Sequence, residues 1–330
     1  MEIKNLGKGL TIVCLVVALL SLILGGCAKS VPAPLPPAAT KPLTPPTPLT
    51  TEPSTPPTPT LTPTPTATAT PKLTPTSTSR PTAPLGEIGG LHYVYWDFGM
   101  SNFRSILVDI TIYSEPDNKD GLYFQMYQGQ INGVGFYFGL QTDVYKPDTG
   151  STGKGLLASR WGTKDLSNVR TVAGGWSQAA GYEGDFVGIR RNYEWTTHSY
   201  QLEISYTESD GEGDWYGIWI LDLNNDAKDS LGSIRFPKTA SDKSGIQNGG
   251  ITWTELYYKK VSETPLPTWH VSVDSIQAVG ASGGRYLPRS ATSDYSKIGN
   301  TDIYYEAATK KIHFVMGPEV RRTHAAGRLF

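Results

Sequence analysis

The chain has 330 residues, 38% of them hydrophobic, and a formal net charge of -1. Its charges are unevenly spread, because the first 85 residues carry six Lys or Arg and two Asp or Glu, which leaves 23 basic and 28 acidic residues after them. A mildly acidic domain without a basic stripe is a poor binder of polyanions, so nucleic acid is excluded as a partner. Both cysteines, Cys14 and Cys27, precede residue 30, so the rest of the chain has no disulfide, thiol nucleophile or thiolate metal site.

Residues 1–26 have the layout of a secretory signal peptide. Lys4 and Lys8 precede 15 uncharged residues, Leu10 to Leu24, which fall short of the roughly 20 apolar residues that span a bilayer. The Leu-Gly-Gly-Cys sequence that ends at Cys27 resembles the lipobox of bacterial lipoproteins, whose cysteine is lipidated and whose leader is cleaved before it. The resemblance implies a membrane partner through a lipid on Cys27, at the outer face of the cell membrane or in the cell envelope. The alternative is an uncleaved signal anchor.

A segment of low complexity follows as far as residue 85. Between Ser30 and Leu85 it holds 18 of the 25 prolines, with many Thr, Ala and Ser residues. Such a composition cannot bury a core and favours extended polyproline II. We therefore predict that residues 27–85 are a lipidated Cys27 followed by a disordered Pro/Thr-rich linker, which spaces the folded part from the membrane.

Past Gly89 the sequence consists of short runs rich in Tyr, Trp, Phe, Ile and Val, separated by Gly, Asp and Asn, without a long helical periodicity. This pattern is typical of strands joined by turns. The predicted strands are 92–96, 106–113, 122–128, 135–141, 155–161, 186–190, 199–207, 215–221, 232–236, 252–260, 270–279, 301–307 and 311–316. They predict an all-β fold, a two-sheet antiparallel sandwich of jelly-roll or lectin-like type, with an up-and-down barrel as the alternative.

The predicted sandwich domain covers residues 86–263. Residues 264–330 are predicted to form a C-terminal strand extension, packed on the sandwich or continuing it. The boundary is placed at Thr264-Pro265-Leu266-Pro267 because prolines interrupt strand pairing.

Several segments of the predicted sandwich share the pattern of one family. The segments, in chain order, are Gly135–Thr142, Gly155–Thr163, Gly181–Phe186, Trp215–Trp219 and Ile234–Pro237. Over about residues 90–260 the chain resembles a family of exported bacterial domains, the domain-of-unknown-function family 3472. The resemblance implies a sandwich domain on a secreted or surface protein, in the neighbourhood of carbohydrate-related modules.

Aromatic and polar side chains alternate with glycines between residues 160 and 185. Aromatic rings stack on the apolar faces of sugars, while carboxylates and Arg bind the hydroxyl groups, and glycines permit tight turns. The predicted ligand-binding residues are Arg160, Trp161, Trp176, Tyr182, Glu183 and Asp185. The alternative is that these aromatic rings fill the core, where large rings dominate packing.

Three of these residues could carry catalysis, two of them carboxylates. Glu183 and Asp185 are two positions apart and would face the same side if their stretch were a strand. Glycoside hydrolysis needs two carboxyl groups, about 5 to 5.5 Å apart with retention and about 6.5 to 9.5 Å apart with inversion. For an enzyme, Glu183, Asp185 and Arg160 are the candidate catalytic residues.

Asp222, Asn224 and Asp226 have the spacing of the first ligands of a calcium loop. Ala227 and Ser233 stand where such a loop needs Gly and Glu, so a polar hairpin turn is favoured over a calcium site. The histidines show no zinc-ligand spacing. No cofactor is predicted, with calcium as the one ion to consider.

These patterns lead to a hypothesis and two alternatives. The leading hypothesis is a surface-displayed, non-catalytic binding module for a glycan or polysaccharide. The alternatives are a glycan-active hydrolase or lyase, and a structural envelope protein that contacts only other proteins. Paired ionisable groups beside aromatic rings would favour the enzyme, whereas exposed rings without a perturbed carboxyl group would favour the binding module.

Overall fold

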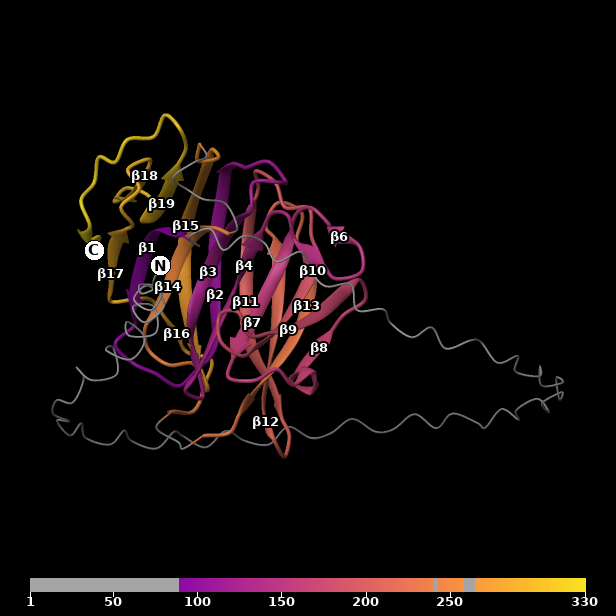
Figure 1. Cartoon of the computed structure of the whole chain (residues 1–330). Helices are drawn as coiled ribbons and strands as arrows, with labels where there is room; N and C mark the ends of the chain where they lie inside the picture. Colours follow the sequence, from indigo (N-terminus) through magenta and orange to yellow (C-terminus); the bar gives the residue numbers. More distant parts are fainter. Residues whose placement is uncertain (1–88, 240–242, 258–264) are drawn as a thin grey trace, which may run out of the picture. The chain divides into compact units, whose positions relative to one another are not determined.

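The computed structural model describes residues 89–239, 243–257 and 265–330 (Figure 1). The predicted signal peptide, Cys27 and the predicted linker lie outside the described residues, as does Thr264 of the predicted domain boundary. In the described part of the chain, no helix has the length and apolar character that a membrane crossing requires.

Two large antiparallel sheets make up the fold (Figure 1). The first sheet contains, in spatial order, β20 (Gly327–Arg328), β17 (Ser290–Tyr295), β1 (Gly89–Asp97), β14 (Gly250–Leu256), β3 (Leu122–Ile131), β4 (Val134–Gln141), β7 (Gly155–Trp161), β10 (Phe186–Asn192) and β9 (Gly175–Ala180). The second contains β18 (Thr301–Glu306), β19 (Lys311–Met316), β15 (Trp269–Gly280), β2 (Phe103–Ser114), β11 (Ser199–Ser209), β12 (Gly213–Asp222), β13 (Ala227–Pro237) and β8 (Val169–Thr171), with β16 (Arg285–Tyr286) paired to β15. The short pair β5 (Tyr145–Lys146) and β6 (Gly150–Ser151) and the single-turn helix η1 (Leu166–Asn168) complete the elements.

The inner faces of the two sheets share one hydrophobic core. Strand β2 shows the underlying alternation, since every second residue from Ile106 to Ile112 is buried. Aromatic rings join the sheets: Phe136 of β4 meets Phe236 of β13 edge to face at 5.8 Å between centroids, and Phe124 of β3 lies 5.7 Å from Trp269 of β15. The predicted all-β, two-sheet antiparallel sandwich is confirmed.

The structure also contains strands that the sequence pattern did not predict. Strands β8, β9 and β17 are among them, and β9 (Gly175–Ala180) falls inside the segment interpreted as a binding loop. Strands β9 and β17 are rich in Ser, Ala and Gln, which give no hydrophobic alternation. Backbone pairing with β10 and β1 specifies them instead.

Residues 269–328 contribute strands to both sheets. Strand β15 lies between β2 and β19 in the second sheet, and β17 pairs with β1 in the first. The C-terminal strands therefore continue the sandwich.

Candidate functional site

The outward-facing side of the first sheet carries a polar and aromatic surface, which we call the outer face. Across β14, β3 and β4, Glu255 pairs with Tyr123, and Tyr123 with Gln141. The next row joins Trp253 to Gln125. Because residues of one row point to the same side of a sheet, these side chains share the face that is turned away from the core.

The rows continue over β7 and β10. Tyr137 of β4 pairs with Ser159 of β7, and Leu157 of β7 pairs with Arg190 of β10. Between them, Gly139 and Gly188 leave two positions of the face without a side chain. A methyl group on Gly188 would come within 2.3 Å of Ser159 Oγ, so this position tolerates no larger residue without movement of its neighbours.

Aromatic rings form a second, smaller hydrophobic cluster on this face, apart from the core. Tyr123, Tyr137 and Leu157 are buried in it, and Trp161 packs against them. The rings of Tyr123 and Tyr137 lie 5.9 Å apart, and those of Tyr137 and Trp161 lie 4.9 Å apart.

A stacked ledge of rings flanks this cluster on β1 and β14. Tyr93 lies 5.4 Å from Trp253 with 14° between the ring planes, and 6.4 Å from Tyr95 with 20° between the planes. The planes of neighbouring rings in the ledge are therefore close to parallel.

Two carboxyl groups meet these rings. Burial, together with the negative charge of Glu183, raises the pKa of Glu255 to about 8. Glu183 comes from the turn between β9 and β10, where its Oε1 accepts a hydrogen bond from Tyr137 Oη at 2.8 Å. Burial also raises the pKa of Glu183, whereas the Tyr137 hydroxyl and the charge of Arg190 oppose that rise. The two carboxyl groups are thus electrostatically coupled, with Glu255 the more strongly perturbed.

Five buried polar atoms of the outer face have no hydrogen-bond partner among the described residues. They are Tyr123 Oη, Gln141 Oε1, Ser159 Oγ, Arg190 Nη1 and Trp253 Nε1. Buried polar atoms in folded proteins are nearly always paired, so unpaired ones grouped on one surface call for a partner from outside the chain. The outer face is for this reason the candidate site.

Only some of the predicted ligand-binding residues lie here. Trp161 is half-buried on the outer face, and Glu183 reaches it from its turn. Arg160 points the opposite way, between the sheets, where it donates a hydrogen bond to the carbonyl oxygen of Arg235 and lies 5.8 Å from the Phe236 ring. Arg160 is therefore separated from Glu183 by the sheet itself.

The other predicted residues have local partners at the end of the face. Trp176 of β9 is buried and donates a hydrogen bond from Nε1 to the Tyr145 carbonyl oxygen at 3.2 Å. Tyr182 is 50% exposed. Asp185 forms an ion pair with Lys164 at 3.1 Å. Residues 181–185 form a turn and not a strand, so the condition that would place Glu183 and Asp185 on one side is not met.

The sequence interpretation missed Glu255, Gln141, Tyr123, Trp253 and Arg190. A signal for one of them was present in β14, where Trp253 and Glu255 alternate with the buried Thr254 and Leu256. A carboxyl group in such an alternating strand, beside an aromatic residue, indicates a functional outer face. Tyr123 of β3 and Gln141 of β4 have no comparable signal in the sequence.

Asp222, Asn224 and Asp226 lie at the hairpin between β12 and β13. The Asp222 carboxylate accepts hydrogen bonds from the Asn224 backbone N–H at 2.9 Å and from the Asn225 side chain at 3.2 Å. Asp226 has a φ of 59°, which is common for Asp in turns. These contacts are those of a polar hairpin turn, and calcium binding stays a prediction. Across the described ranges, no group of three or more His, Cys, Asp or Glu side chains is arranged to hold a metal ion.

Comparison with known proteins adds little to this site. The chain matches no protein-family model and no curated protein, so the resemblance to family 3472 stays a prediction. Among solved structures it is similar to scytalidoglutamic peptidase with a peptide-based transition-state analogue, with a TM-score of 0.38 and 9% identity over 69% of this chain and 99% of that one. It is also similar to SCP-B, a member of the eqolisin family of peptidases, in complex with the tripeptide Ala-Ile-His, with a TM-score of 0.33 and 11% identity over the same shares. Such low scores carry no argument about activity.

Proposed function

We propose that the chain is a hydrolase whose active site is the outer face of the first sheet, with Glu255 as the general acid and Glu183 as the general base. The supporting observation is the desolvated carboxyl group of Glu255, whose pKa is raised to about 8 partly by the charge of Glu183 on the exposed turn before β10. Titratable groups whose surroundings separate their pKa values are suited to acid and base roles at one pH.

The division of roles follows from the two surroundings. At neutral pH Glu255 is mostly protonated and can donate a proton to a leaving group. Glu183 is held closer to its ionised form by the Tyr137 hydroxyl and the charge of Arg190, so it can accept a proton from an attacking water molecule. After bond cleavage, proton exchange with solvent restores both groups.

The unpaired polar atoms favour a polypeptide substrate. Tyr123, Arg190 and Trp253 offer hydrogen-bond donors, whereas Gln141 Oε1 offers an acceptor. Such donors can bind carbonyl oxygens, and a peptide backbone has one at every residue. The donors would also polarise the carbonyl group under attack, as an oxyanion-stabilising site does.

A glycan substrate is the second candidate, and one observation favours it. The nearly parallel rings of Tyr95, Tyr93 and Trp253 suit stacking on sugar rings, and Trp253 Nε1 has no hydrogen-bond partner among the described residues. Carbohydrate binding without catalysis would use the same ledge and would not need the coupled carboxyl groups.

The test compares three variants on two substrate panels. Glu255→Gln and Glu183→Gln are each expected to lower kcat/KM on fluorogenic peptides by roughly 100-fold or more, the range for loss of a general acid or base. Asp185→Asn is the matched control, because Asp185 is in the same turn but pairs with Lys164, and it should stay within about twofold of the wild type.

The outcomes separate the candidates. Release of reducing ends from polysaccharides, without peptide cleavage, would replace the peptide proposal with glycan hydrolysis. Saturable glycan binding without any hydrolysis would leave a binding module. Activity unchanged in both Glu variants would contradict the assigned roles.

We also propose that the chain is an exported lipoprotein of family 3472, anchored through Cys27. This proposal rests on the leader, the lipobox-like sequence and the family resemblance, all of them sequence features.

A further inference from the structure

A column of five rings lies on the outward side of the second sheet, across β2, β15, β19 and β18 and on into the residues after β19. We call it the ring column; it consists of Tyr113, His270, His313, Tyr304 and His324. Tyr113 stacks on His270 at 4.4 Å, Tyr304 stacks on His313 at 4.6 Å, and His324 stacks on the other side of Tyr304 at 5.4 Å. Three of the five histidines of the chain are thus gathered on one surface.

The two central histidines face each other through nitrogen atoms. His270 Nε2 and His313 Nδ1 are 3.1 Å apart and share a hydrogen bond, whose proton a bound ion would replace. Metal–imidazole bonds are about 2.0 to 2.1 Å long, so two nitrogens bound to one ion are roughly 2.9 Å apart at a right angle and roughly 3.4 Å apart in a tetrahedron. The observed separation lies within this range.

The second nitrogen of His313 has the surroundings typical of a metal ligand. His313 is 6% exposed, and its Nε2 lies 3.5 Å from Glu306 Oε2. A carboxylate on the far nitrogen of a histidine fixes the ring and its tautomer, which leaves the lone pair of the near nitrogen for the metal.

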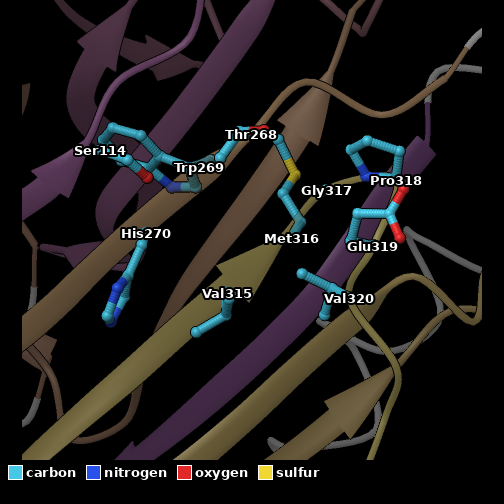
Figure 2. Close-up of a pocket in the computed structure, with 10 residues that line it drawn as sticks. All are labelled: Ser114, Thr268, Trp269, His270, Val315, Met316, Gly317, Pro318, Glu319 and Val320. Atoms are coloured by element: carbon cyan, nitrogen blue, oxygen red, sulfur yellow. The ribbon is translucent and has the colours of Figure 1, made fainter.

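A cavity of about 260 Å³ lies beside the backbone of this segment and is lined by residues of β15, by the end of β19 and by the loop that follows it. In Figure 2 the nitrogen end of the His270 ring points away from Pro318 and Glu319, and His313 does not line the cavity. The cavity is therefore not part of the proposed site.

We propose that His270 and His313 form a binding site for a divalent copper ion, with water as the remaining ligands. The described residues bring no third His, Cys, Asp or Glu to the pair, which sets the protein ligands at two. Copper(II) suits such a site because it favours imidazole nitrogen and right-angled positions, and it binds more tightly than the other divalent ions of its row. The site is on the opposite sheet from Glu255 and does not depend on the proposed hydrolase.

The experiment titrates CuSO₄ into the full-length chain, purified without a polyhistidine tag, and records electron paramagnetic resonance spectra. The wild type is expected to bind one copper ion with hyperfine structure from two nitrogens. His270→Asn and His313→Gln should each weaken binding by about tenfold or more and remove one nitrogen, and Glu306→Gln should weaken it by about tenfold. His324→Asn is the matched control, because His324 stacks on Tyr304 away from the pair, and it should bind as the wild type does.

Several outcomes would overturn the proposal. Absence of saturable binding by the wild type is one, and wild-type affinity in His270→Asn is another. A spectrum with nitrogen coupling that is lost in His324→Asn would place the copper elsewhere. His313 is buried, so His313→Gln could fail to fold. In that case copper binding by His270→Asn, at a half-exposed position, is the test of the proposed site.

Discussion

At the scale of single residues, Glu255 links the stability of the fold to pH. Its pKa is raised from 4.5 to about 8 on folding, so between these values the folded chain holds a proton that the unfolded chain has lost. The contribution of this group to stability is therefore fully present below pH 4.5 and falls as the pH rises towards 8. Since one pKa unit corresponds to about 1.4 kcal/mol, the loss is several kcal/mol at most.

Replacement of Glu255 by Gln should remove this dependence, because Gln has nearly the same shape and no titrating proton. In urea unfolding, the wild type should lose about 2 kcal/mol or more relative to Glu255→Gln between pH 5 and pH 9, and the variant should be the more stable of the two at pH 9. Parallel pH profiles for the two proteins would show that the carboxyl group of Glu255 is not desolvated in solution.

The sequence located some of these residues and not others. Glu183 and Trp161 were selected because polar and aromatic residues alternate with glycines near them. Glu255 and Gln141 were not, since they are 114 positions apart in the chain and become neighbours of Tyr123 only through the pairing of β14, β3 and β4. A pKa shift that arises from burial and from a second distant carboxyl group has no local sequence pattern.

At the scale of elements, β10 and β7 pack so closely under the outer face that position 188 has room only for glycine. Gly188→Ala would place a methyl group 2.3 Å from Ser159 Oγ and 3.0 Å from the Ala158 carbonyl oxygen. We expect this substitution to destabilise the fold by about 1 to 3 kcal/mol, as overpacking does. Urea unfolding would measure the change.

Gly211→Ala is the matched control for that experiment. Gly211 lies before β12, and a methyl group there would meet no atom within 4 Å. Its effect should stay within about 0.5 kcal/mol. Equal changes in the free energy of unfolding for the two substitutions would mean that the residues around Gly188 can move to accept a methyl group without loss of stability.

Strands were predictable where buried and exposed residues alternate, as in β2 and β14. Strand β17 has the same alternation of burial, but its buried positions are Ala291 and Ser293, so neither it nor β9 has an alternation of hydrophobic residues in the sequence. Both strands are held by pairing with their neighbours. The stretch around Glu183 was considered as a strand, but Gly184 has a φ of 90° and the stretch turns. Glycine supplies that conformation without strain, and β propensity alone does not reveal it.

At the scale of the whole molecule, the proposed anchor predicts a change of compartment. Cys27→Ala should abolish incorporation of labelled fatty acid during growth of the producing bacterium, because the acyl chains attach to that sulfur. The protein should then leave the membrane fraction for the soluble one, since it would lose the acyl chains that hold it.

Labelling that persists in Cys27→Ala would contradict the lipoprotein proposal. Cys14→Ala is the control: it changes the other cysteine of the chain and should leave the labelling intact.

The class of the fold was predictable from the sequence, whereas the order of strands was not. Many short, aromatic-rich runs favour a sandwich over any helical fold. The placement of β15 between β2 and β19, and of β17 beside β1, depends on contacts between residues far apart in the chain. Such non-local pairings are set by the packing of whole faces, which a single sequence does not display.

Because β15 lies in the middle of the second sheet, this sheet cannot be completed until the C-terminal part of the chain has been synthesised. Strand β2 ends at Ser114, yet one of its two neighbours begins only at Trp269, so the second sheet stays open at its middle until that segment has been synthesised. Pairings over such long sequence separations form slowly. A chain that leaves the cytoplasm as an unfolded thread would therefore pass through its translocation channel before this sandwich could close.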